Sequence, residues 1–275
     1  MRIGIVNASS RFSRERGAAI EAWFAAHVTD GSVEAVIHPA SYAEHGHFGG
    51  DDASRAAAFV EYANDPGVDA VWFARGGYGS CRIAGAVLPQ LTGAAREKRY
   101  LGYSDAGTLL AGMYKAGFAQ VAHGPMASDA VRDPAAARRA LDWLTSGDPA
   151  SWEPSLHDDP RPAAAFNLSI LDALVGTELE PDLSGHVLML EEVSEPLYRV
   201  DRMMFHLTGQ ASIRRVAGIR LGRVSEVVAN DPDFGLTAEE IVRDWCGRTG
   251  IPYLGAADIG HDADNKVVPF GPRPA

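Results

Sequence analysis

The feature that most constrains this chain is an alternation, through its first half, of short apolar runs with longer segments of helical periodicity. Ile3–Val6 and Val68–Phe73 are such apolar runs, and Arg16–Val28 between them repeats its apolar residues every three or four positions. This alternation is typical of a parallel sheet covered by helices on both faces. The sequence therefore predicts the α/β fold class, beginning with a Rossmann-like parallel-sheet domain.

A stretch rich in Pro and Asp interrupts the pattern in the middle of the chain. It contains Gly147–Pro149 and Asp158–Pro162, which are made of turn-forming residues. Strand-like and helix-like segments alternate again beyond it. We therefore expect two domains, residues 1–150 and a smaller α/β domain at residues 151–275, with the Pro- and Asp-rich stretch as the linker.

Composition excludes several classes of protein. Asp and Glu number 36 and Lys and Arg number 25, which gives a formal net charge of −11, whereas a nucleic-acid binder needs clustered Lys and Arg. No run approaches the roughly 18 apolar residues of a membrane helix. The two cysteines, Cys81 and Cys246, cannot form a disulfide framework. Because Met1–Asn7 lacks the features of a signal peptide, we expect a cytoplasmic protein with no nucleic-acid or membrane partner.

The segment Leu101–Gly107 places a serine, Ser104, between a short strand and the start of a helix. This is the arrangement of a nucleophile elbow, in which a tight turn presents the hydroxyl and the next backbone N–H faces a developing oxyanion. The flanking pattern here is Gly-x-Ser-x-Ala. A serine in this place can equally cap the helix, and the local sequence leaves both interpretations open.

A serine nucleophile needs a base and a group that orients this base. His261 lies in the glycine-flanked turn Asp258–Asp262, after a short strand. Glu191 follows the apolar run Val187–Leu190, and a partly buried carboxylate at a strand end needs a partner. The next residue, Glu192, is expected to face solvent. The order serine, acid, histidine is shared with α/β-hydrolases and does not decide the fold.

The glycine-rich segment Arg75–Ser80 supplies a second part of the predicted site. Gly76 and Gly77 follow an apolar run, and glycine backbone there can turn its N–H groups toward an anion. Neither of the common phosphate-binding fingerprints is present. Donation of hydrogen bonds to an oxyanion is the favoured function, and a plain glycine turn is the alternative.

Together these segments resemble the LD-carboxypeptidase family of serine peptidases, which includes the muramoyltetrapeptide carboxypeptidases and the microcin C immunity proteins. The Arg-Gly-Gly-Tyr-Gly and Gly-Tyr-Ser-Asp blocks are specific in combination, and the resemblance covers nearly the whole chain in order. The matching segments are Val71–Ser80, Gly102–Asp105, His123–Met126, Asn167–Ser169, Leu190–Glu192, Tyr198–Arg202 and Gly260–His261.

The resemblance implies a catalytic triad of Ser104, His261 and Glu191 that is divided between two domains. It implies an oxyanion hole made by backbone N–H groups near Gly77 and of Asp105. The implied reaction is hydrolysis of the bond between an L-centre and a D-residue, such as release of terminal D-Ala from murein tetrapeptide. A homodimer without metal or organic cofactor is also implied.

Two departures from the family pattern concern substrate specificity, which pocket walls determine. Family members usually carry glycines before the Asn of the Asn-Leu-Ser block, where this chain has Ala163–Phe166. The chain also ends soon after His261. Arg75 and Arg202 are candidates for attracting the carboxylate of a peptide substrate.

Three other functions stay open on the sequence. The first is a microcin-C-type hydrolase of peptidyl- or aminoacyl-nucleotide conjugates, which pocket aromatics able to stack a nucleobase would favour. The second is an esterase of α/β-hydrolase type, which a single eight-stranded sheet would favour. The third is a non-enzymatic small-molecule binding module, which wide separation of Ser104 from His261 would favour.

Overall fold

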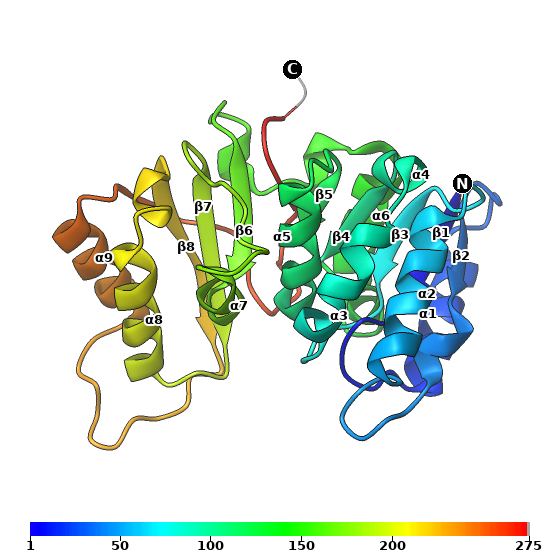
Figure 1. Ribbon diagram of the computed structural model, residues 1–275, viewed down its shortest axis with the longest axis horizontal. Helices are drawn as coiled ribbons and strands as arrows, with labels where there is room; N and C mark the ends of the chain where they lie inside the picture. Colours follow the sequence, from blue (N-terminus) through cyan, green and yellow to red (C-terminus); the bar gives the residue numbers. More distant parts are fainter. Residues whose placement is uncertain (274–275) are drawn as a thin grey trace.

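A computed structural model describes residues 1–273 and arranges them in two sheets, each with its own helices (Figure 1). The strands within this range are β1 (Arg2–Val6), β2 (Glu34–Ile37), β3 (Ala70–Phe73), β4 (Arg99–Gly102), β5 (Val121–His123), β6 (Ala163–Asn167), β7 (Val187–Val193), β8 (Gly218–Ser225), β9 (Tyr253–Ala256) and β10 (Val268–Pro269). The α-helices are α1 (Arg14–His27), α2 (Asp52–Asn64), α3 (Ser80–Val87), α4 (Gly93–Arg96), α5 (Gly107–Lys115), α6 (Pro134–Ser146), α7 (Leu168–Leu174), α8 (Leu197–Gly209) and α9 (Ala238–Thr249). No helix among residues 1–273 has the length and apolar content needed to cross a bilayer.

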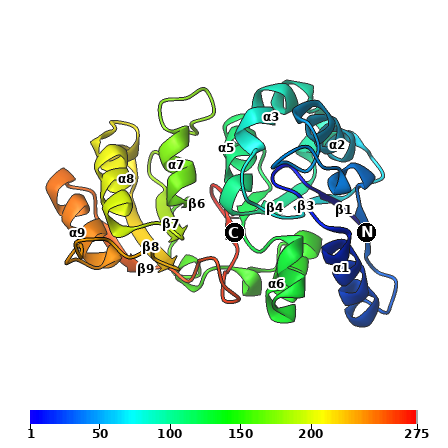
Figure 2. The same cartoon turned by 90° about the horizontal axis from the view of Figure 1, so that it is seen from below.

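The first sheet has the strand order β10-β5-β4-β3-β1-β2. Strands β1 to β5 pair in parallel, and β10 joins β5 antiparallel. Helices α1 and α6 cover one face, while α2, α3 and α5 cover the other (Figure 2). The α/β class predicted from the alternating pattern is therefore confirmed. Because the parallel strands end at one edge, the loops after β1, β3 and β4 meet there, where open α/β sheets bind ligands.

The second sheet is parallel throughout, in the order β6-β7-β8-β9. Helices α7, α8 and α9 lie along one of its faces (Figure 2). Aromatic packing joins the two sheets, since Phe270 lies 5.1 Å from Phe166 of β6 and 5.7 Å from Tyr114 of α5 between ring centroids. The end of the chain thus returns from the second sheet to the first and holds the two together.

The Pro- and Asp-rich stretch, which the sequence predicts as the linker, is packed against the C-terminal segment. Pro149 and Pro154 each begin a short 3₁₀ turn. Between these turns the Glu153 N–H donates to the carbonyl of Val267, and the Val267 N–H donates to that of Ser151. Proline pre-sets the backbone for such turns, and the turns bring this stretch against the returning C-terminal segment.

Strands β5 and β6 and helix α3 are elements that the sequence pattern did not predict. Strand β6 is the clearest case, because its run Ala163–Phe166 is rich in alanine, which has a weak strand preference. These residues are almost fully buried and pair with β7 from Val187 to Leu190. Tertiary packing therefore makes a strand where the local sequence gives little indication of one.

Gly222 lies where β8 packs against the segment around Ile259, and a substitution there tests this contact. A Cβ atom there would lie 2.6 Å from Ile259 Cγ1, 2.7 Å from the Ile259 carbonyl oxygen and 3.1 Å from Glu191 Cβ. We expect Gly222→Ala to lower the free energy of unfolding by about 1–3 kcal/mol, the usual cost of overpacking. Gly247→Ala is the matched control, because Gly247 lies in α9 with open space around it, and alanine stabilises a helix by about 0.5–1 kcal/mol.

Denaturant unfolding of both variants measures the difference. Equal stability of the two variants would contradict the close approach of β8 to the segment around Ile259.

Candidate active site

Ser104 occupies a strained turn directly after β4. Its φ is +55°, in the left-handed region that residues with a Cβ seldom adopt. The flanking residues must be small, because a Cβ on Gly102 would lie 3.0 Å from the Cβ of Ala106 and 2.8 Å from Phe73. Alanine at 106 is compatible with this turn as long as residue 102 is glycine. The pattern Gly-x-Ser-x-Ala therefore builds the same elbow as Gly-x-Ser-x-Gly.

The Ser104 side chain does not cap the helix that follows it. The N-cap residue of α5 is Ala106, and the 3₁₀ turn Ser104–Ala106 has Tyr103 at its N-cap; neither cap makes a side-chain hydrogen bond. The capping interpretation left open by the sequence is thus not supported by the local geometry.

The glycine segment after β3 runs alongside the Ser104 hydroxyl. A Cβ on buried Gly76 would lie 3.2 Å from Ser104 Oγ, a tighter contact than most Cβ atoms make, so glycine suits this close approach of the backbone. Gly77 has φ +111°, and a Cβ there would lie 2.2 Å from Ser10 Oγ. Residue 77 is consequently restricted to glycine both by its conformation and by the loop after β1.

The Asp105 carboxylate is fully buried and fixes the glycine segment in place. It accepts hydrogen bonds from the backbone N–H groups of Gly79 and Ser80, at 3.2 and 2.8 Å, and from the hydroxyl of Ser9. A carboxylate at the first turn of α3 also suits the positive end of that helix. No local signal in the sequence indicates Ser9 or this role of the Asp105 side chain, because both depend on the loops after β1, β3 and β4 meeting.

Glu191 and His261 form a close pair near the carboxyl ends of the strands of the second sheet. Glu191 lies in β7 and is 0% exposed, and its Oε2 lies 2.6 Å from Nδ1 of His261. The other oxygen, Oε1, has no hydrogen-bond partner among residues 1–273. A buried carboxylate with one partner depends strongly on that partner, so this pair fixes the imidazole ring.

The environment of His261 favours its protonated form. Burial lowers the pKa of His261, but the hydrogen bond and charge of Glu191, aided by the charges of Glu192 and Asp129, outweigh burial and hold it above the ordinary 6.5. The ring also packs against Tyr103, with centroids 4.8 Å apart. This is the electrostatic arrangement of a histidine that accepts a proton during a reaction.

Glu192 is buried, which corrects the expectation that it faces solvent. It is 2% exposed and accepts hydrogen bonds from Asn167 Nδ2 at 2.7 Å, from the Ser169 N–H at 2.8 Å and from the Ser169 hydroxyl. Neighbouring residues of a strand point to opposite faces, so the carboxylates of Glu191 and Glu192 bind different residues. Glu192 joins β7 to the start of α7, and the Asn-Leu-Ser block supplies its donors.

Ser104 and His261 line one cavity of about 460 Å³ at the carboxyl edge of the first sheet. No direct hydrogen bond between them is present within residues 1–273. Arg75, one of the two predicted carboxylate-binding candidates, lines this cavity, whereas Arg202 lies on α8 over the ring of Tyr198. The lining residues are Arg16, Arg75, Gly76, Gly77, Tyr103, Ser104, Met126, Ser128, Asp129, Arg132, Val193 and His261. The alanines of β6 do not contribute to this wall.

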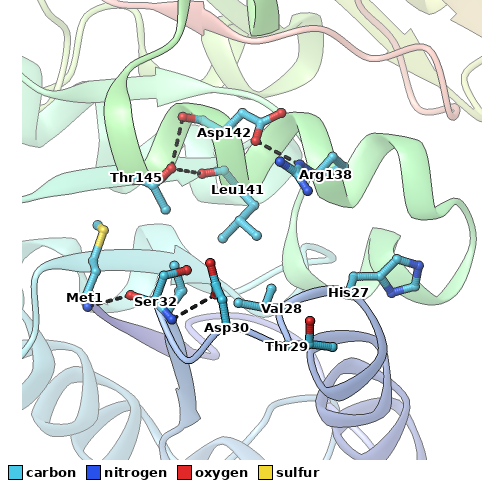
Figure 3. A pocket seen from close by; sticks show the side chains of 11 residues that line it. Met1, His27, Val28, Thr29, Asp30, Ser32, Arg138, Leu141, Asp142 and Thr145 are labelled. Carbon is cyan, nitrogen blue, oxygen red and sulfur yellow. Dashed lines mark hydrogen bonds and ion pairs between the residues drawn. The ribbon is translucent and has the colours of Figure 1, made fainter.

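A second cavity of similar size, about 450 Å³, lies near the amino ends of β1 and β2 (Figure 3). Its polar groups are largely paired with one another: Arg138 with Asp142 at 2.9 Å, and the terminal amine of Met1 with the carbonyl of Ser32 at 2.9 Å. The His27 ring of this cavity pairs with the Trp23 carbonyl at 2.8 Å and with no carboxylate among residues 1–273. The cavity at Ser104 is therefore the candidate active site.

Sequence comparison matches both halves of the chain to one family. The LD-carboxypeptidase N-terminal domain matches residues 3–124, and the LD-carboxypeptidase C-terminal domain matches residues 164–274. A Synechocystis sp. protein whose name assigns it as a carboxypeptidase is 31% identical over 234 residues, covering 83% of this chain and 76% of its own.

The chain belongs to the LD-carboxypeptidase family. It is accordingly an enzyme of the serine-type carboxypeptidase class, as its resemblance to that family predicts. The murein tetrapeptide carboxypeptidase of Pseudomonas aeruginosa is 28% identical over 227 residues, covering 75% of this chain and 71% of its own.

Solved structures share the fold. The muramoyltetrapeptide carboxypeptidase of Oxalobacter formigenes has a TM-score of 0.80 at 23% identity, covering 98% of this chain and 93% of its own. The microcin C7 self immunity protein MccF has a TM-score of 0.81 at 18% identity, covering 98% of this chain and 91% of its own. At these identities the likeness establishes the two-domain α/β fold.

The Glu191–His261 pair predicts a pH dependence. Because the raised pKa of His261 arises from Glu191, Glu191→Gln should lower it, and the acid limb of kcat/KM should move to lower pH as the neutral base persists further into acid. Histidine ring signals followed by NMR against pH measure the pKa directly. Glu195→Gln is the control, since Glu195 pairs with Arg199 at 3.1 Å. An unchanged His261 pKa in Glu191→Gln would contradict this account.

Proposed function

We propose that this enzyme cleaves an L,D-peptide bond with Ser104 as nucleophile, His261 as base and Glu191 as the group that orients the base. The observation that carries the proposal is a single cavity lined by a strained serine and by a histidine held on a buried carboxylate. The serine comes from the first sheet and the other two from the second half of the chain.

In the proposed reaction, His261 takes the Ser104 proton as Oγ attacks the scissile carbonyl carbon. The imidazolium then donates this proton to the leaving amine, which departs as the C–N bond breaks. Water attacks the resulting ester, with His261 again accepting the proton, and Ser104 is regenerated. His261 accepts and donates the protons in each of these reaction steps, so the proposed chemistry needs no metal or organic cofactor.

The oxyanion of the tetrahedral intermediate has donors close to Ser104. We assign them to backbone N–H groups of the Gly76–Gly77 segment and of Asp105. Two observations support this assignment. Gly76 lies close to Ser104 Oγ, and the Asp105 carboxylate accepts hydrogen bonds from the backbone that follows the two glycines. Each preorganised donor of this kind is worth roughly 3 kcal/mol in the transition state.

We infer that the substrate is a murein peptide with a terminal D-Ala. Two proteins that this chain resembles are named as carboxypeptidases of murein tetrapeptide and of muramoyltetrapeptide. The cavity also offers little for stacking a nucleobase: among its described lining residues Tyr103 carries the only phenol ring, and it is 3% exposed and packed between His261 and His123.

Two of the other functions are disfavoured by the architecture. The structure has separate six-stranded and four-stranded sheets within residues 1–273, whereas an α/β-hydrolase esterase was expected to have a single eight-stranded one. Ser104 and His261 share a cavity, whereas a binding module without catalysis was expected to hold them apart. Hydrolysis of nucleotide conjugates stays as a rival outcome, because MccF is known in complex with glutamyl sulfamoyl guanosine.

We further propose a cytoplasmic homodimer with domains 1–150 and 151–275. Processing of recycled murein peptides fits the cytoplasm. Helix α8 carries Phe205 and Tyr198 with 59% and 45% of their surface exposed, and this apolar surface is compatible with contact between copies.

A substrate panel followed by mass spectrometry tests the function. The panel contains murein tri-, tetra- and pentapeptides beside aminoacyl-nucleotide conjugates, and we expect loss of D-Ala from the tetrapeptide. Ser104→Ala should reduce this turnover at least about a thousandfold, because it removes the nucleophile. Ser128→Ala, a serine on the same cavity wall, should keep most of it.

Circular dichroism confirms that each variant is folded. Full turnover by folded Ser104→Ala would overturn the mechanism. Cleavage of nucleotide conjugates with no action on any murein peptide would contradict the assignment of a murein peptide as the substrate.

A further inference from the structure

Three arginines converge on the cavity without an anionic partner. Arg16, Arg75 and Arg132 all line it, and none lies within 4.0 Å of a carboxylate oxygen among residues 1–273. The chain has 36 acidic residues against 25 basic ones, so carboxylates are plentiful. Three guanidinium groups without an ion-pair partner in one cavity of an acidic protein are therefore available to an anion from outside the chain.

The three cations also disfavour one another. Burial lowers the pKa of Arg75, and the charges of Arg16 and Arg132 lower it further. A bound carboxylate would relieve both effects, since an opposite charge nearby favours the charged form.

Asp129 is the one acid on the described cavity wall, and it forms no ion pair within 4.0 Å with any of the three arginines. Its Oδ2 accepts a hydrogen bond from the Met126 N–H at 2.6 Å. Burial raises the pKa of Asp129 to about 6, and the charges of Arg132 and His261 oppose that rise. Asp129 therefore offsets part of the charge of Arg132, while Arg75 is left without a carboxylate partner among residues 1–273.

Arg75 is the arginine that adjoins the glycine segment beside Ser104. It directly precedes Gly76 and Gly77, and its Nη2 lies 3.7 Å from where a Cβ on Gly77 would be. Its Nη1 donates to the carbonyl of Arg11 at 2.6 Å, which fixes the guanidinium while leaving other N–H groups available. Arg16 and Arg132 are more exposed and line the same cavity.

We propose that Arg75 binds the free carboxylate of the substrate residue that is released, and that Arg16 and Arg132 raise the positive potential around it. This assignment rests on the proposed function. In an exopeptidase the terminal carboxylate lies one residue beyond the scissile carbonyl, so its receptor must lie close to the oxyanion donors. Arg75 meets this requirement, and it makes the cavity select chain ends over internal bonds.

A pair of substrates tests the assignment: one L,D-peptide with a free terminal carboxylate and the same peptide as its C-terminal amide. The wild-type enzyme should prefer the acid by about tenfold to a hundredfold in kcat/KM, the range for hydrogen bonds to charged groups. Arg75→Gln should abolish this preference by raising KM for the acid alone, and Arg75→Lys should restore part of it. Arg202→Gln is the control, because Arg202 lies outside the cavity.

The ratio of acid to amide separates binding from a structural role, because a misplaced loop would slow both substrates alike. Equal loss on both substrates in Arg75→Gln would therefore overturn the assignment. Retention of the wild-type ratio in that variant would overturn it as well.

A binding measurement separates this inference from the proposed function. Calorimetric titration of Ser104→Ala with N-acetyl-D-alanine and with its amide needs no turnover. Tighter binding of the acid, lost when Arg75→Gln is added, supports the subsite even if the enzyme hydrolyses no L,D-peptide. Equal binding of the two probes overturns the subsite even if L,D-peptides are hydrolysed.

Discussion

The buried carboxylate of Glu191 is the constraint on which the rest of the site depends. A fully buried charge with a single hydrogen-bond partner is tolerated only where its surroundings hold that partner in place. Gly222 lets β8 approach Glu191 and Ile259 closely, and the Arg223 N–H donates to the Ile259 carbonyl at 2.9 Å. The loop that carries His261 is thereby fixed to the same sheet as its carboxylate.

The position of that sheet relative to Ser104 depends on the end of the chain. Strand β10 pairs with β5, and Phe270 packs against Phe166 and Tyr114. His261 lies just before this returning segment, so packing between the sheets also sets its distance from the strained turn at Ser104. An active site divided between two sheets requires such a rigid connection, because small displacements of catalytic groups are costly.

The sequence predicts best what is decided locally. The alternating pattern yields the α/β class, and the small residues at 102 and 106 mark the turn at Ser104. The burial of Glu192 was not predictable, because its donors Asn167 and Ser169 lie on another strand and helix. The grouping of Arg16 and Arg132 beside Arg75 has no local signal either, since these residues approach one another only when the first sheet is formed.

The most direct test of the central claim is covalent labelling by a fluorophosphonate, located by peptide mapping in a mass spectrometer. An activated serine reacts with this reagent, whereas ordinary serines are inert. The account predicts a single label on Ser104, formed at least about tenfold more slowly when Glu191 is replaced by Gln, because the base is then less well oriented. A label on another residue, or no label in the folded wild-type enzyme, would contradict it.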